Sequence, residues 1–184
     1  MNSLETIASQ LAETALTLGA IKVQPDTPFT WASGKKMPLY NDNRLLLGSA
    51  QNRLLVSQGL QSLLASLSVD PDVIAGTATA GIPHATTLAD QLQQPLIYVR
   101  PTPKEHGMKN QIEGPLKQGQ TVVVVEDLIS TGGSALKVVD ALRDAGASVS
   151  HCLSIFSYGF PDTIRRFEDH HCQLHPLLNF ETLM

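Results

Sequence analysis

Two adjacent acids follow an apolar run in the segment TVVVVEDLISTGGSAL, residues 121–136. Four valines lead into Glu126 and Asp127, and a turn rich in hydroxyls and glycines comes after them. Ligands of open parallel sheets bind beyond the carboxyl ends of the strands, so a buried strand here would present both acids to a ligand. Because successive strand residues point to opposite faces, we expect the pair to bind two hydroxyls or a hydrated metal ion rather than to share a proton.

The turn after the acids has the composition of a phosphate site. Hydroxyl groups come from Ser130, Thr131 and Ser134, while Gly132 and Gly133 let the chain turn tightly before a helix. Backbone N–H groups at a helix N-terminus bind anions, and this turn lacks the lysine of the Walker loop of nucleoside-triphosphate motors. The acids and the turn together predict a sugar-phosphate site, with the carboxylates on the ribose hydroxyls and the turn on the 5-phosphate.

The segments around this site alternate between strand and helix patterns. Apolar residues recur at helical spacing or in short continuous runs, with glycine and proline between them. This alternation predicts an α/β fold in which helices flank a central parallel sheet. We expect helices at about residues 4–18, 48–67, 83–93, 134–145 and 161–170, and strands at about 72–76, 95–100, 121–125 and 149–159.

The chain has the size and composition of one globular domain. It has 184 residues, of which 42% are hydrophobic, and this is enough for a sizeable core. Short β-like pieces and proline-containing turns follow the first helix. We therefore divide the domain into an N-terminal helix and hood, at about residues 1–47, and an α/β core at about residues 48–184.

Charge and cysteine content narrow the choice of partners and compartment. The formal net charge of -4 gives no general attraction to nucleic acid or to anionic lipid. The N-terminal residues do not resemble a signal peptide, and no apolar run approaches the roughly 18 residues of a membrane span. Two cysteines, Cys152 and Cys172, are too few for a disulfide framework. We expect a cytoplasmic protein with no nucleic-acid or membrane partner.

The stretch VVVVEDLISTGGS resembles the phosphoribosyl-pyrophosphate (PRPP) binding signature of the type I phosphoribosyltransferases. The resemblance implies the fold of that family, a parallel sheet flanked by helices with a small N-terminal hood. It assigns PRPP binding to the two acids and to the members of the turn, which are Ser130, Thr131, Gly132, Gly133 and Ser134. A strand-to-helix turn of an unrelated α/β protein is the alternative interpretation.

Three further stretches resemble one branch of this family, the orotate phosphoribosyltransferases. FTWASGKKMPLYNDNR, residues 29–44, resembles their hood segment, and GTATAGIPHA, residues 76–85, resembles their pyrophosphate loop. YVRPTPKEHGMKNQIEG, residues 98–114, resembles their mobile catalytic loop. Enzymes of this branch transfer the 5-phosphoribosyl group from PRPP to orotate, which gives orotidine 5-phosphate and pyrophosphate on the way to UMP.

The hood and the pyrophosphate loop supply further candidate residues. By resemblance, orotate contacts Arg44, Lys36 and Thr131, and the pyrophosphate of PRPP contacts Thr79, Ala80 and Gly81. Arg44 can pair with the carboxylate of orotate in a bidentate fork, and a salt bridge to a neighbouring acid is the alternative. The family often has a non-proline cis peptide in the pyrophosphate loop. We interpret His84, close to the start of the next helix, as a structural residue.

The polar loop at residues 101–115 and its flanking Arg100 concentrate positive charge in a net acidic protein. Cations that close over a departing pyrophosphate stabilise the transition state more than the ground state. The resemblance implies that Arg100, Lys104 and His106 bind PRPP, and that Lys104 and His106 act with the acid pair in catalysis. It also implies that both loop residues reach into the site of a neighbouring subunit, and hence a homodimer with shared active sites. A solvated polar loop with incidental charge is the alternative.

Mg²⁺ is the cofactor that we expect. Oxygen atoms of PRPP would hold it with few protein contacts, Asp127 is the nearest candidate ligand, and we assign no residue firmly to the metal. A zinc site among His170, His171, Cys172 and His175 is disfavoured, because the segment has the pattern of strand and turn rather than helix and no second Cys-x-x-Cys element exists.

Three positions of this chain differ from the residues found in part of the family. Many enteric-type relatives carry lysines where this chain has Ala32, Ala80 and Pro101.

Two other functions remain open. A non-catalytic PRPP sensor would keep the phosphate turn but would not need the basic loop. An enzyme of the same fold that acts on a purine or another pyrimidine would not need the guanidinium of Arg44.

Overall fold

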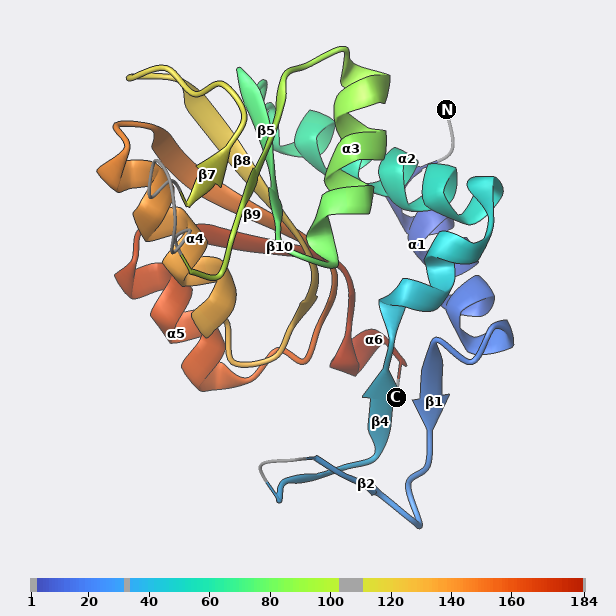
Figure 1. Cartoon of the computed structure of the whole chain (residues 1–184). Coiled ribbons are helices and arrows are strands. Elements are labelled where there is room, and N and C mark those ends of the chain that lie inside the picture. The colour runs from blue at the N-terminus through green and yellow to red at the C-terminus, as the bar shows by residue number, and fades with distance from the viewer. Residues whose placement is uncertain (1–2, 32–33, 103–110, 184) are drawn as a thin grey trace.

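The computed structural model describes residues 3–31, 34–102 and 111–183, and its centre is a six-stranded sheet (Figure 1). The strands lie in the order β10-β9-β8-β5-β6-β7, and every pair is parallel except β6 with β7. Their bounds are β5 (Val73–Thr77), β6 (Leu96–Val99), β7 (Ile112–Glu113), β8 (Thr121–Ile129), β9 (Ser148–Ser157) and β10 (Gln173–Asn179). The fold class predicted from the sequence is confirmed.

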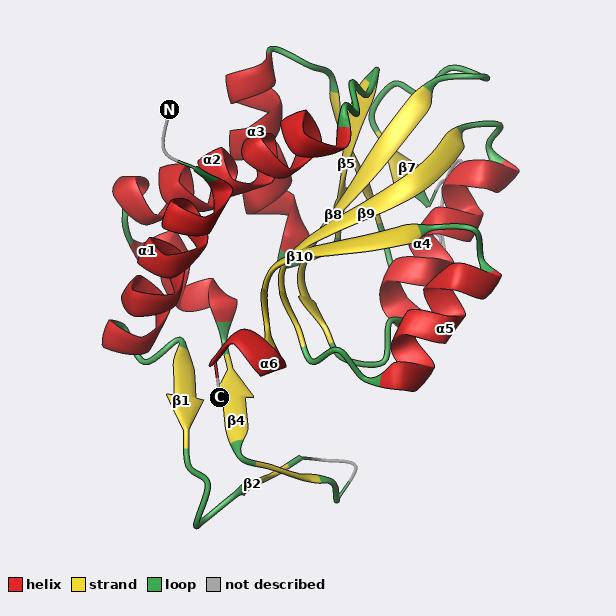
Figure 2. Ribbon diagram, turned by 180° about the vertical axis from the view of Figure 1, so that it is seen from behind, coloured by secondary structure: helices red, strands yellow, loops and turns green. Residues whose placement is uncertain are grey.

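Helices cover both faces of this sheet. Figures 1 and 2 show α4 (Gly133–Asp144) and α5 (Pro161–Asp169) on one face, and α1 (Leu4–Thr17), α2 (Ala50–Leu67) and α3 (Gly81–Leu92) on the other. A single turn, α6 (Phe180–Leu183), follows β10. Among the helices that the structure describes, none has the length and hydropathy that a membrane crossing requires.

The valine run of β8 is explained by burial on both faces. Val122 and Val124 belong to the apolar cluster under α4 and α5, whereas Val123 and Val125 belong to the cluster under α1, α2 and α3. All four side chains are almost fully buried. A strand that is covered on both sides loses the alternation of apolar and polar residues, so the continuous run predicted its position correctly.

The hood is a small β structure that hangs below the sheet (Figure 2). It consists of two antiparallel pairs, β1 (Ile21–Val23) with β4 (Leu39–Asn41) and β2 (Phe29–Thr30) with β3 (Lys36–Met37). Tyr158, just after β9, donates a hydrogen bond to the carbonyl oxygen of Leu39 at 3.3 Å, and its ring meets that of Trp31 edge-on at 4.7 Å between centroids. Contacts of this kind fix the hood against the core.

The structure differs from the predicted elements in several places. A 3₁₀ helix, η1 (Asn43–Gly48), links the hood to α2, and the short strand β7 lies inside the segment we expected to be a loop. β10 continues through Pro176, where we expected a turn, because this strand lies at the edge of the sheet and proline there interrupts no second ladder. β8 does not end at Val125 but runs on through both acids.

The predicted division at about residue 47 stays a prediction. It falls inside η1, which contacts both α1 and α2. The hood and the core share one apolar cluster, in which Met37 and Leu39 pack with residues of the helices and the sheet.

Candidate functional site

A crevice forms where β5 and β8 leave their shared ladder. The two strands pair up to Gly76 and Val125, after which β5 turns into α3 while β8 continues against β9 as far as Ile129. α3 and α4 then lead to opposite faces of the sheet (Figure 1). Ligands of open α/β sheets bind at such a switch point, so the topology places the candidate site at Glu126 and Asp127.

Glu126 is a buried acid at the wall of this crevice. Only 8% of it is exposed, and its Oε1 accepts a hydrogen bond from the backbone N–H of Asp127 at 3.0 Å. Burial, and next a hydrogen bond with the side chain of Asp127, raise its pKa to about 8, while a hydrogen bond with Thr77 acts in the opposite direction. The Glu126 side chain thus bends back toward its neighbour, and our expectation that the two carboxyl groups do not share a proton stays a prediction.

Asp127 is half-buried, and its backbone is tied to the segment that follows the hood. Asn43 at the start of η1 donates a hydrogen bond from Nδ2 to the carbonyl oxygen of Asp127 at 2.6 Å. Asn43 is itself only 1% exposed. The end of β8 is thus held from the sheet on one side and from η1 on the other, and no pattern in the sequence predicts this contact.

The turn after β8, at residues 130–134, is packed on α5, and we call it the cradle. Gly132 has a φ of +77°, and a Cβ there would lie 2.7 Å from the ring of Phe167, so only glycine fits. Thr163 donates a hydrogen bond to the carbonyl oxygen of Ser130 at 2.7 Å. Within the described residues no side chain caps the first turn of α4, which leaves its N–H groups directed at the site. Thr131 and Ser134 are exposed beside them.

The pyrophosphate loop faces this cradle across the crevice. Its Ala78–Thr79 peptide bond is cis. A Cβ on Gly81 would lie 2.5 Å from the carbonyl oxygen of Val125, so glycine lets α3 begin directly against β8. α3 starts at Gly81, two residues before the proline where we expected it, and Thr79 and Ala80 stand just before it.

A cavity of about 120 Å³ lies between the pyrophosphate loop and α4. Two cations line it: Arg100, whose Nη1 lies 3.7 Å from Oε1 of Glu113, and Lys137, which the sequence analysis missed. Lys137 follows Ser134 by three residues, and this helical spacing was the available signal. The lining residues are Thr77, Ala78, Val99, Arg100, Pro101, Gln111, Glu126, Ser134, Lys137 and Val138.

The hood cations occupy different surroundings. Arg44 is exposed and forms a bidentate pair with Asp42, at 2.7 Å from Nε and 3.0 Å from Nη2. This pairing raises the pKa of Arg44, and Asp127 contributes to it more weakly, so the guanidinium lies within electrostatic reach of the site. Lys36 is exposed on β3, while Nζ of Lys35 lies 3.3 Å from the centroid of the Phe160 ring.

The structure therefore brings together most, but not all, of the predicted site residues. The acids, the cradle, the pyrophosphate loop and Arg100 border one crevice, and Arg44 approaches it from the hood. Lys104 and His106 lie outside the described residues, as does Ala32.

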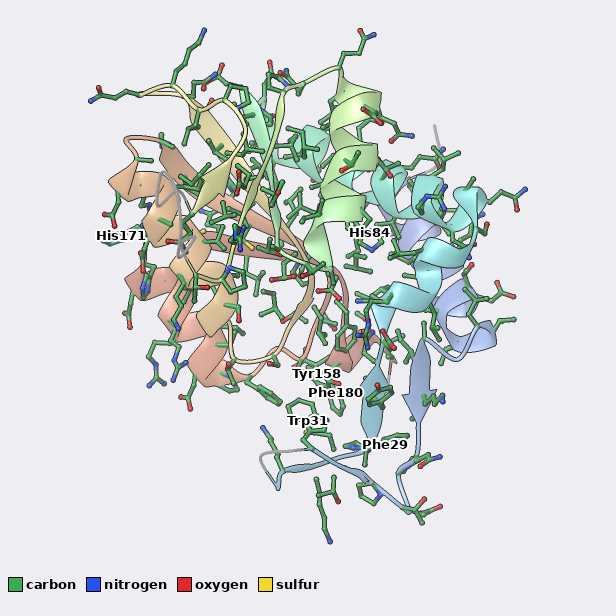
Figure 3. All side chains as sticks on the ribbon, in the orientation of Figure 1. Phe29, Trp31, His84, Tyr158, His171 and Phe180 are labelled. Carbon is green, nitrogen blue, oxygen red and sulfur yellow. The ribbon has the colours of Figure 1, made fainter. Side chains whose placement is uncertain are left out.

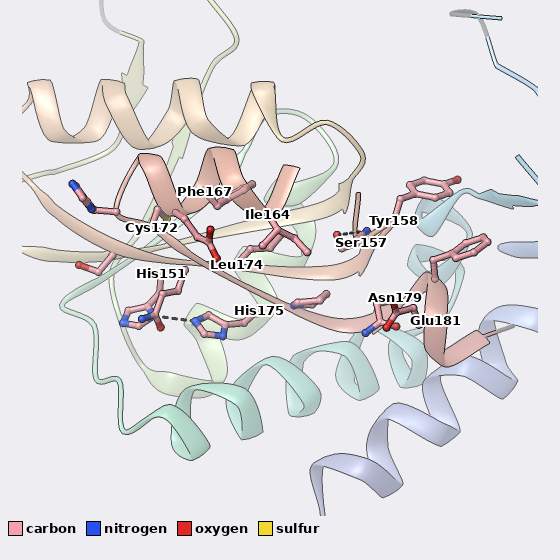
Figure 4. Close-up of a pocket in the computed structure, with 17 residues that line it drawn as sticks. His151, Ser157, Tyr158, Ile164, Phe167, Cys172, Leu174, His175, Asn179 and Glu181 are labelled. Atoms are coloured by element: carbon pink, nitrogen blue, oxygen red, sulfur yellow. Dashed lines mark hydrogen bonds between the residues drawn. The ribbon is translucent and has the colours of Figure 1, made fainter. Parts of the chain in front are cut away.

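A larger cavity, of about 850 Å³, lies at the opposite edge of the sheet along β10 (Figure 4). Nδ1 of His151 and Nε2 of His175 are hydrogen-bonded there at 3.1 Å. His170 instead approaches Asp140 at 3.9 Å, and Cys172 is buried. In the part of the chain that the structure describes, no three potential ligands converge on a metal position.

The comparisons with known proteins agree with this geometry. Residues 51–169, more than half of the chain, match the model of the phosphoribosyl transferase domain. A relative from Listeria innocua named orotate phosphoribosyltransferase is 49% identical over 179 residues, which cover 97% of this chain and 86% of the relative.

Solved structures show the same likeness. The crystal structure of orotate phosphoribosyltransferase from Aeropyrum pernix is 31% identical, with a TM-score of 0.82 and coverage of 94% of this chain and 95% of that one. The enzyme of the same name from Mycobacterium tuberculosis, determined in complex with PRPP, is 25% identical with a TM-score of 0.74, over 96% of this chain and 98% of that one.

The raised pKa of Glu126 predicts a specific pH dependence of stability. The folded protein binds this proton more tightly than the unfolded chain, so the contribution is fully present below the ordinary pKa of 4.5 and is lost as the pH rises through about 8. Glu126→Gln should therefore be more stable than the wild type above pH 8, by on the order of 1–3 kcal/mol. Urea unfolding between pH 5 and 9 measures this difference. Glu13→Gln, an exposed acid of α1, is the control, and parallel curves for all three proteins would contradict the assignment.

The cradle gives a second prediction, from two adjacent glycines. Gly132→Ala should lower the free energy of unfolding by about 1–3 kcal/mol and weaken binding of inorganic phosphate, because the new Cβ meets Phe167 and the φ is left-handed. Gly133→Ala should leave stability unchanged, since nothing lies within 4 Å of a Cβ there. Calorimetric unfolding of both variants tests this prediction, and equal unfolding temperatures for Gly132→Ala and Gly133→Ala would contradict the left-handed conformation of Gly132 against Phe167.

Proposed function

The chain belongs to the phosphoribosyl transferase family, and from that premise we infer that it is an orotate phosphoribosyltransferase of pyrimidine biosynthesis. This enzyme is a pentosyltransferase that converts PRPP and orotate into orotidine 5-phosphate and pyrophosphate. The observation that carries the inference is that one strand end presents an acid pair and an anion cradle to the same crevice. The relatives that share nearly the whole chain carry this function in their name.

PRPP fits the crevice along the end of β8. The 5-phosphate lies on the cradle formed by the turn, whose members are Ser130, Thr131, Gly132, Gly133 and Ser134. The ribose 2- and 3-hydroxyls lie near Glu126 and Asp127. A protonated Glu126 can donate to one hydroxyl oxygen while Asp127 accepts from another, so the different surroundings of the two acids suit a diol.

The pyrophosphate of PRPP lies between the pyrophosphate loop and the cavity behind it. Backbone N–H groups of Thr79, Ala80 and Gly81 can approach it closely, and Arg100 and Lys137 supply positive charge. These two cations support pyrophosphate binding although Ala80 stands where many relatives have a lysine.

Orotate N1 attacks the anomeric carbon, and the bond to the pyrophosphate oxygen breaks as the new C–N bond forms. The pyrophosphate leaves with the bonding electron pair, and the N1 proton is released to water. The sugar passes through a cation-like state that the carboxylate of Asp127 favours electrostatically. Lys104 and His106 close over the departing pyrophosphate, and His106 can protonate it. Positioning accounts for most of the catalysis, because no side chain forms a covalent bond with the substrate.

Mg²⁺ and a second subunit complete the proposed site. The carboxyl oxygens at the end of β8 are suitable magnesium ligands, Asp127 being the more exposed, and PRPP oxygens would supply the rest of the shell. The ion would neutralise part of the pyrophosphate charge. The likeness of residues 98–114 to a mobile loop that crosses between subunits supports a homodimer with shared sites.

A cytoplasmic location accords with the two cysteines. Both Cys152 and Cys172 are free thiols in the core, and burial raises the pKa of each, that of Cys172 to about 11. Inert, buried thiols persist without difficulty in a reducing compartment.

The decisive test is pyrophosphate release from PRPP and Mg²⁺ in the presence of a panel of bases. We expect pyrophosphate release with orotate and with no other base of the panel. Release with adenine, hypoxanthine or uracil alone would indicate a different base, and PRPP binding without release with any base would indicate a sensor.

Arg44 gives a sharper prediction for base recognition. Arg44→Ala should raise the KM for orotate by about tenfold or more while the KM for PRPP stays within about twofold, because only the base carries a carboxylate for this guanidinium. Arg165→Ala is the matched control, since Arg165 is also exposed and also pairs with a nearby acid, Asp162. Steady-state kinetics with each substrate varied in turn measures the effect, and an unchanged KM for orotate would remove Arg44 from the base site.

A further inference from the structure

His84 is a buried histidine without a hydrogen-bond partner among the described residues. It is 1% exposed, and neither Nδ1 nor Nε2 is paired. Figure 3 shows it near the N-terminal end of α3. The reaction derived above does not use it, and the structural role expected from the sequence does not explain an imidazole at this position.

The position of His84 on α3 directs it toward the end of β8. Gly81 lies directly against the backbone of Val125, and His84 follows it by one turn of the helix. Side chains three residues apart lie on neighbouring parts of the same helix face, and they lean toward the N-terminus of the helix. The imidazole therefore points to the end of β8, where Asp127 and Arg53 act on its charge with opposite sign.

A second unpaired polar group lies in the same corner. Asn43 donates from Nδ2 to the carbonyl oxygen of Asp127, but its Oδ1 is buried and unpaired within the described residues. Burial lowers the pKa of His84 to about 4, so the ring is neutral near pH 7 and offers one donor and one acceptor.

An unpaired buried imidazole costs stability. A buried polar group without a partner loses its hydration and gains no hydrogen bond in return, whereas an apolar side chain of similar size at the same place would stabilise the folded protein. Polar groups of this kind concentrate at sites where function requires them. Substitution of His84 by leucine therefore distinguishes the two roles. It should lower the stability of the protein if the histidine is structural, and it should leave stability unchanged or higher but weaken ligand binding if the histidine serves function.

We propose that His84 is a positioning residue for the Asp127 carboxylate. When the sugar hydroxyls draw Asp127 into its binding geometry, the ring N–H of His84 donates a hydrogen bond to the carboxylate from the buried side. Asn43 holds the backbone of the same residue from η1, so that the side chain and the main chain of Asp127 are both fixed. This inference rests on the proposed function, since it assigns Asp127 to the ribose.

The experiment compares His84→Leu with His84→Asn and His84→Gln, which keep a neutral N–H donor near Nδ1 or near Nε2. In His84→Leu we expect an unfolding temperature equal to or above that of the wild type, together with about tenfold weaker binding of PRPP. One of the two amides should recover most of the lost affinity. Titration calorimetry with PRPP alone measures binding, and His170→Leu, at a partly exposed histidine that follows α5, is the control.

Two results would overturn the proposal. Unchanged PRPP affinity in a folded His84→Leu would show that the ring does not act on Asp127, and failure of all three variants to fold would show a structural role. The readout also separates this inference from the proposed function, because it needs no base. A wild type that binds PRPP but releases no pyrophosphate with orotate would refute the function and leave the effect of His84 on PRPP binding measurable.

Discussion

The site depends on β8 continuing past the point where β5 leaves the sheet. Four valines, buried on alternate faces, fix this strand, and the ladder with β9 carries it on through the acids. Because β5 has already turned into α3, Glu126 pairs with Ser154 of β9 on one side and has the start of α3 against its backbone on the other. The carboxyl group is therefore buried beside Asp127, and its pKa rises. The crevice, the cradle and the pyrophosphate loop all follow from where the two strands part.

Several features of the crevice are unfavourable for stability. Among the described residues, the buried Glu126 has no ion-pair partner, and neither the ring of His84 nor Oδ1 of Asn43 has a hydrogen-bond partner. The large apolar clusters on both faces of the sheet offset these local costs. Polar groups that would prefer a partner are then available to the hydroxyls and phosphates of a ligand. The turn is also held against α5, because Thr163 donates a hydrogen bond to the carbonyl oxygen of Ser130.

The sequence predicted the parts of the fold that depend on local pattern. The valine run, the glycine turn and the alternation of strands and helices each have a periodicity or composition of their own, and each was found in place. Contacts between distant segments had no such signal. The hydrogen bond from Asn43 to Asp127 joins residues that are 84 positions apart. The contact of the Glu126 side chain with Asp127 depends on burial that no sequence pattern encodes. Lys137 was not predicted, because the resemblance to the PRPP signature ends at Ser134, three residues before it. Edge position, which the sequence does not reveal, likewise explains why β10 tolerates Pro176.

The central claim is that one strand end holds both the ribose and the 5-phosphate of PRPP. A crystal structure of the protein with PRPP and Mg²⁺ tests it most directly. The account predicts the 5-phosphate on the N–H groups of residues 130–134, with both ribose hydroxyls within hydrogen-bond distance of Glu126 or Asp127. PRPP bound elsewhere, for example in the larger cavity along β10, or bound with its ribose away from both acids, would contradict it.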